Sequence, residues 1–143
     1  MKIIESKILS LSTFQDNIER YMEDITKSIE EQIVDINVEQ QYSGLRSDGE
    51  SIRPPYAEST KRRKKRKGQP TDRVTLRDTG QYHASFAMSY EPDSFSIYAQ
   101  DFKAKYLVHR YTTKIYGIQD EYLKALAEEI YQPRLVERLR KQL

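Results

Sequence analysis

The chain of 143 residues has no cysteine, no tryptophan and only two histidines, His83 and His109. Without cysteine there can be no disulfide bridge, no thiolate zinc site and no cysteine nucleophile. Neither histidine stands at a metal-ligand spacing from a second strong ligand, and the sequence has no glycine-rich phosphate loop and no nucleophile elbow. We therefore expect a protein that is not an enzyme and that uses no metal or cofactor.

Long apolar runs are also missing. No run approaches the ~20 residues of a membrane helix, and residues 1–7 lack the apolar core of a signal peptide. The lack of cysteine fits a reducing compartment. We expect a soluble protein that is made in the cytoplasm and has no membrane partner.

The composition is polar for a globular protein of this length. Hydrophobic residues make up 37% and charged residues 32%, and there are eleven tyrosines. Tyrosine is amphipathic and is common where a surface is apolar but still wet, as at contacts between subunits. A single domain over residues 1–143, with a thin core or with surfaces completed by neighbours, is the expected organisation.

The first half of the chain predicts a helix followed by a long loop. Apolar residues at spacings of three and four predict a helix over residues 12–37, which a capping box at Ser12 would open. From residue 38 to residue 75 this period is lost, and glycines and prolines are frequent. We expect an extended loop there, and a loop of this length is usually functional or disordered.

The second half predicts a small sheet and then helices, which makes the fold α+β. Within residues 76–117, two alternating runs joined by Glu91-Pro92-Asp93 predict a β-hairpin, the base of a small antiparallel sheet. Residues 112–116 favour a further strand. Tyr106-Leu107-Val108 fits either a strand or one helical turn. Residues 118–143 predict C-terminal helices, which Pro133 would kink or restart.

The loop contains seven consecutive cations, Lys61, Arg62, Arg63, Lys64, Lys65, Arg66 and Lys67. This run carries +7 within a net charge of +2, so the rest of the chain carries −5. Because like charges repel, the run is not expected to fold alone, and we expect none of it to be buried. With Arg53 it forms our candidate interaction loop. It can bind nucleic acid through phosphates, dock on an acidic protein surface, or be a solvated loop tip.

The loop is followed by Leu76-Arg77-Asp78-Thr79-Gly80-Gln81-Tyr82-His83-Ala84-Ser85-Phe86. Asp78-Thr79-Gly80 predicts a turn, and Asp78 or Thr79 can cap a brief helical turn through Ala84. We assign this stretch a structural role, as the turn that fixes the loop to the sheet. Its candidate residues are Leu76, Asp78, Thr79, Gly80, Tyr82 and Ser85.

This stretch resembles a signature of small tailed-bacteriophage morphogenesis proteins, namely tail-completion, tail-terminator and head–tail joining proteins. The signature has a leucine, a threonine-glycine turn, an aromatic residue, and a serine before an apolar residue. The order of elements is similar too: a long helix, a basic loop, the turn, a hairpin and C-terminal helices. Residues 105–111 would match a tyrosine-containing segment of the family, and residues 115–117 the end of a strand.

The resemblance implies a structural protein of the virion, assembled in the host cytoplasm. Such proteins form closed rings around the DNA channel at the neck or tail end and have no active site. Portal or head-completion proteins and tail proteins would be the partners, with possible nonspecific contact to DNA in the channel. The alternative is a small cytoplasmic protein that binds nucleic acid without sequence preference through Lys61–Lys67.

Overall fold

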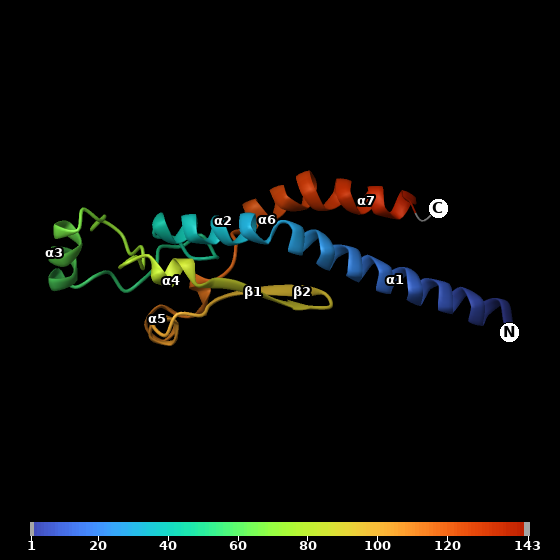
Figure 1. The fold of residues 1–143 in the computed structure, drawn as a ribbon, viewed down its shortest axis with the longest axis horizontal. Helices are drawn as coiled ribbons and strands as arrows, with labels where there is room; N and C mark the ends of the chain where they lie inside the picture. Colours follow the sequence, from blue (N-terminus) through green and yellow to red (C-terminus); the bar gives the residue numbers. More distant parts are fainter. Residues whose placement is uncertain (1, 142–143) are drawn as a thin grey trace.

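The computed structural model describes residues 2–141, with side chains from residue 13 onward. The fold is α+β, as expected, and the molecule is elongated (Figure 1). Its elements are α1 (Lys2–Ser28), α2 (Glu30–Tyr42), α3 (Glu58–Arg66), α4 (Gln81–Ala84), β1 (Phe86–Glu91), β2 (Ser94–Ala99), α5 (Ala104–Tyr111), the 3₁₀ turn η1 (Thr113–Ile115), α6 (Asp120–Leu126), the π-helical segment η2 (Ala127–Tyr131) and α7 (Gln132–Lys141).

The predicted N-terminal helix exists, but its bounds were wrong. The helix begins at Lys2, so Ser12 lies inside it and is not its first residue. It also continues five residues beyond residue 37, after a break at Ile29. Side chains explain the break, because Thr26 donates to the Met22 carbonyl at 2.8 Å and Ser28 donates to the Ile25 carbonyl at 2.6 Å. Such bonds compete with the backbone ladder and bend helices.

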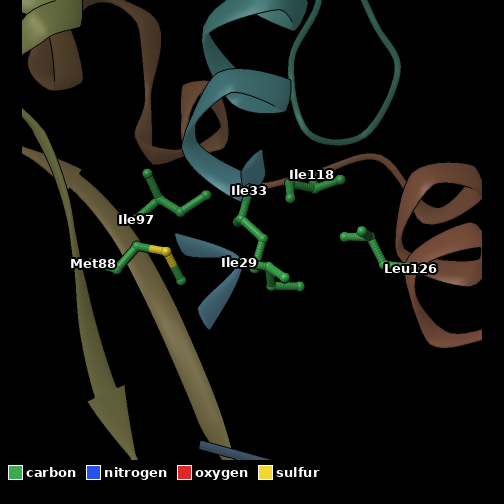
Figure 2. Packing of buried hydrophobic residues seen from close by; sticks show 6 residues of the cluster. All are labelled: Ile29, Ile33, Met88, Ile97, Ile118 and Leu126. Atoms are coloured by element: carbon green, nitrogen blue, oxygen red, sulfur yellow. The ribbon is translucent and has the colours of Figure 1, made fainter. Parts of the chain in front are cut away.

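The β-hairpin forms where alternation predicted it, and it builds the first half of the core. β1 and β2 pair antiparallel, with Met88 opposite Ile97. These two side chains pack on Ile29 and Ile33 at the junction of α1 and α2, and Ile118 and Leu126 complete the cluster (Figure 2). Met88 and Ile97 thus face the core from adjacent strands, and they orient the hairpin against the long helix.

A second apolar cluster lies beside the first and holds the loop region to the body. It buries Ile52, Val74, Leu76, Tyr82, Tyr111 and Ile115. Leu76 and Tyr82 come from the candidate structural turn, whereas Ile52 and Val74 come from the stretch expected to be an extended loop. That stretch is therefore anchored by its own apolar residues at both ends of the basic segment.

The expected strand over residues 112–116 was wrong. Thr113–Ile115 form a 3₁₀ turn, and the ambiguous Tyr106-Leu107-Val108 lies in helix α5. The reason is that the backbone here pairs with side chains instead of with another strand. Asn37 and Gln41 both donate to the Ile115 carbonyl, at 3.0 and 2.8 Å.

Side chains of helix α2 also form hydrogen bonds with the backbone groups of residues 117 and 119. Gln40 donates to the Gly117 carbonyl and accepts from the Gln119 amide, each at 3.0 Å. Asn37 in turn accepts from the Gly117 amide at 3.0 Å. Buried backbone groups must be paired, and here amide side chains supply the pairs that a neighbouring strand would otherwise supply.

The C-terminal helices are confirmed through Lys141; the last two residues of that predicted region lie outside the described part. A π-helical segment comes directly before α7, where Pro133 lacks the N–H that a regular helix would use. Thr26 and Tyr131 join their hydroxyls at 2.7 Å, and Arg138 pairs with Asp24 at 3.1 Å, so α7 lies along α1. Within residues 2–141, no helix is both long and apolar enough to cross a membrane.

We expect Asn37→Leu to lower the free energy of unfolding by about 3 kcal/mol, because it removes one buried and one partly buried hydrogen bond and leaves the Gly117 amide unsatisfied. Urea unfolding of the purified protein measures this. Glu39→Leu, the same replacement at an exposed position of α2, is the control and should stay within about 0.5 kcal/mol of the parent. Equal effects of the two variants would contradict the structural role of Asn37.

Candidate functional site

The basic run forms a helix, which corrects the expectation of an extended loop over residues 38–75. Helix α3 spans Glu58–Arg66 and has its acidic residue in the first turn and four cations in the last turn. Both placements suit the helix dipole, which favours negative charge at the start and positive charge at the end. Lysine and arginine are also good helix formers.

A glycine ends this helix in a defined way. Gly68 has a φ of +71°, which a residue with a side chain rarely adopts. The amide of Gly68 donates to the Lys65 carbonyl at 3.1 Å, and the amide of Gln69 donates to the Lys64 carbonyl at 2.9 Å. This pair of bonds is a Schellman motif, so the end of α3 is fixed.

Lys64 is buried, contrary to the expectation that no residue of the run can be. Its exposed fraction is 8%, and its ammonium group donates to Gln69 Oε1 at 3.2 Å and to the Arg77 carbonyl. The same group lies 4.7 Å from the centre of the Tyr56 ring. Burial is tolerated because the charge keeps polar partners and an aromatic face. Lys64 thus anchors α3 to the structural turn.

Asp78 clamps the other end of the run. Its carboxylate pairs with Lys67 and, at 3.2 Å, with Lys103 from the segment before α5. Hydrogen bonds from Lys67 and then Lys103 lower the pKa of Asp78 to about 2. The Asp78 carbonyl also accepts from Gln69 Nε2 at 2.9 Å. One aspartate therefore joins the basic segment, the turn and the body.

The other turn residues each serve local structure. The Thr79 hydroxyl accepts from the Gln81 amide at 3.3 Å, and Gly80 has a φ of +98° just before α4. Ser85 donates to the Tyr82 carbonyl at 2.7 Å and accepts from the Asp101 amide at 3.0 Å, which ties the turn to the end of β2. The turn is held by these bonds at both ends.

Tyr82 and Leu76 connect the turn to the second apolar cluster. The Tyr82 hydroxyl donates to that of Tyr116 at 3.2 Å, and burial raises the Tyr82 pKa. Leu76 is buried, and its amide donates to the Tyr56 hydroxyl at 2.9 Å. The Thr75 amide binds the same hydroxyl at 3.0 Å. Tyr56 therefore holds the turn with its hydroxyl and Lys64 with its ring face.

Three anchoring residues, Tyr56, Gln69 and Lys103, were not among our sequence candidates. Tyr56 follows two prolines and is an aromatic residue in a polar loop, which was a usable signal for a half-buried anchor. Gln69 and Lys103 gave none, because a single polar residue in a loop has no periodic pattern. Arg53, which was a candidate, is exposed and lies outside α3.

Four cations of the run are exposed and have no ion pair among the described residues: Arg62, Arg63, Lys65 and Arg66. Lys61 does not belong to this set, because it pairs with Glu58 at 3.6 Å. Because successive helical residues are about 100° apart, the four side chains span an arc of roughly 160° centred opposite Lys64. The anchored side of α3 thus faces the body, and the free side presents four positive charges.

The two histidines do not join this surface. His83 is buried, and its Nε2–H donates to Gln41 Oε1 at 3.0 Å. Burial, with Arg77 and Lys64 nearby, lowers the His83 pKa to about 4, so the ring is neutral at pH 7. His109 is exposed on α5. Among the described residues, no three His, Asp or Glu side chains are placed to hold a metal ion.

We expect Asp78→Asn to lower the free energy of unfolding at pH 7 by about 1 kcal/mol, the upper range for an exposed ion pair. The aspartate pKa is ~3.9 in the unfolded chain and about 2 in the folded protein. An aspartate whose pKa is lower in the folded protein contributes its full stabilisation at a pH above its pKa in the unfolded chain. This stabilisation is lost as the pH falls through the pKa of the folded protein. The difference between parent and variant should therefore shrink from pH 4 to pH 2.

Urea unfolding at several pH values measures this difference. Asp16→Asn is the control, since Asp16 is exposed on α1, and its effect should stay below about 0.5 kcal/mol at every pH. A difference for Asp78→Asn that stays constant from pH 4 to pH 2 would contradict the clamp.

Comparisons with known proteins do not place this chain in a family. No family model, no curated protein and no solved structure matches it. The resemblance to phage morphogenesis proteins therefore stays a prediction from the sequence.

Proposed function

We propose that this protein is a structural virion protein of a tailed phage, which forms a ring at the head–tail connector, the neck or the tail end. In this role it performs no catalysis and works through its surfaces. Portal or head-completion proteins and tail proteins are its proposed partners. The turn around Gly80 fixes α3, and α3 is the arm that contacts a neighbour.

The observation that carries this proposal is the large surface of the chain. The protein exposes 9966 Å², whereas a compact monomer of its mass, 16.9 kDa, exposes about 7,700 Å². A stable interface covers about 800 Å² of each partner, and a ring subunit makes two such interfaces. The excess of roughly 2,300 Å² is thus enough for both.

Exposed aromatic side chains agree with this proposal. Phe102 is 72% exposed, Tyr106 is 63% exposed and Phe14 is 48% exposed. Aromatic residues are enriched at interfaces between proteins, because they bury a large area at a low cost in side-chain entropy. They lie on α1 and around α5, well apart along the molecule (Figure 1). A subunit that contacts neighbours on two sides needs separated surfaces of this kind.

A second candidate function, nonspecific binding of nucleic acid, is favoured by the four unpaired cations on α3. Each cation that neutralises a phosphate releases a counterion, so four contacts predict a slope of log K against log salt of roughly −3.6 for duplex DNA. No tyrosine, phenylalanine or tryptophan stands within α3, so base stacking is not expected and sequence preference should be absent.

Size-exclusion chromatography with light scattering separates the two candidates. It is run at about 0.1 M and about 1 M salt, where the Debye length is about 10 Å and about 3 Å. We expect a mass of several subunits at the lower salt, and ring-shaped particles in electron micrographs of that fraction. Binding of a duplex DNA fragment is measured on the same sample.

A monomer that binds duplex DNA tightly at low salt, with the steep slope given above, would contradict the ring subunit and favour the second candidate. A monomer that assembles only when portal or tail proteins are added is compatible with the virion role and would contradict the nucleic-acid-binding protein.

A further inference from the structure

A groove of about 1240 Å³ opens on the hairpin side of α1. It lies among α1, the turn between β1 and β2, residues 116–121 and the start of α6. Its apolar lining includes Ile18 and Met22 of α1, Phe95 of β2, and Leu123 and Leu126 of α6. Leu126 belongs to the buried core, whereas Ile18, Met22 and Phe95 are half-buried and Leu123 is exposed, so the upper part of this lining is open to solvent in the single subunit.

The groove is also strongly acidic. Seven carboxylates line it, against the single cation Lys114. Two of the seven are paired within the subunit, Glu23 with Lys27 at 2.9 Å and Asp48 with Arg46 at 2.5 Å. The other five have no ion pair among the described residues; they are Glu19, Glu91, Asp93, Asp120 and Glu121.

This groove and the free face of α3 match in charge and in chemistry. Five unpaired carboxylates line one surface, and four unpaired cations are exposed on the other. Lysine and arginine also have long apolar stems, which can cover an apolar lining while their charged ends reach acidic groups. A groove that is apolar and acidic together therefore fits a basic helix better than a nucleic acid, whose phosphates it would repel.

The two surfaces cannot meet within one molecule. Helix α3 lies at one end of the elongated chain, and the hairpin turn and α1 extend toward the other end (Figure 1). Their contact requires a second copy, and the contact is head-to-tail, because each copy uses a different surface toward each neighbour. Such heterologous contacts propagate and close into a ring when the rotation per subunit allows.

We propose that the acidic groove binds helix α3 of a second copy of this chain. This inference rests on the proposed ring function and deepens it by naming the two surfaces that meet. Only the free face of α3 can enter the groove, because the opposite face is held on its own subunit through Lys64. Lys64 and Lys67 stay on the anchored side, and Arg62, Lys65 and Arg66 enter the groove.

Charge reversal tests this contact. The helix variant carries Arg62→Glu, Lys65→Glu and Arg66→Glu, and the groove variant carries Glu91→Lys, Asp93→Lys and Glu121→Lys. Each variant alone places like charges together, so we expect the concentration needed for assembly to rise about 100-fold or more. One chain with all six substitutions restores opposite charges and should assemble as the parent does. A 1:1 mixture of the two triple variants should assemble too.

The control variant carries Lys124→Glu, Arg140→Glu and Lys141→Glu, the same change in charge as the helix variant but at exposed positions outside both surfaces. It should assemble like the parent. Light scattering at about 0.1 M salt, where the Debye length is about 10 Å, gives the mass of each sample. Thermal unfolding followed by circular dichroism verifies that every variant is folded.

The outcomes separate this inference from the function on which it rests. The contact is overturned if the triple variants assemble like the parent or if the six-fold variant stays monomeric. In that case, a ring of the parent protein still supports the proposed function. A parent monomer that joins only other virion proteins overturns the contact alone. A parent monomer that binds only duplex DNA overturns both. Loss in each triple variant with rescue in the six-fold variant and in the mixture supports the contact.

Discussion

The structure depends on the hydrogen bonds that three amide side chains of α2 make to the backbone of residues 115–119. Asn37, Gln40 and Gln41 donate to the Ile115 and Gly117 carbonyls, and Asn37 and Gln40 accept from amides of the same segment. These bonds hold an irregular segment in the interior without a partner strand. Because Ile115 and Ile118 belong to different apolar clusters, the same bonds also fix the clusters relative to each other.

Local patterns in the sequence predicted the elements that form through interactions between residues close together in the chain. The hairpin follows from alternation around Pro92-Asp93, and the helix over Ile25, Ile29 and Ile33 follows from their spacing. Asn37 and Gln41 continue that spacing by steps of four from Ile33. A polar residue at an apolar position was the available sign of a buried amide, but its backbone partner lies more than 70 residues away. Sequence spacing alone could not show that partner.

The basic segment shows how tertiary contacts override charge repulsion. Seven adjacent cations predicted an unfolded loop, but the carbonyl of Arg77, the ring of Tyr56 and the carboxylate of Asp78 take up two of those charges. The helix can then form with its four unpaired cations, Arg62, Arg63, Lys65 and Arg66, on one side. The loop from Gly68 to Asp78 is therefore the support of α3, and the threonine-glycine turn positions a charged surface by fixing that support.

We propose that the charge segregation of this chain serves contacts between copies. Zero-length carbodiimide cross-linking of an equal mixture of ¹⁴N- and ¹⁵N-labelled protein, read by mass spectrometry, tests this most directly, because it joins only lysines and carboxylates that touch. The Lys67–Asp78 pair is an internal standard and should appear within one copy. If α3 of one copy lies in the groove of another, mixed-isotope links from Lys65 to carboxylates of the groove, such as Asp93 or Glu121, are expected. A map with the internal link and no mixed-isotope link from Lys65 would contradict it.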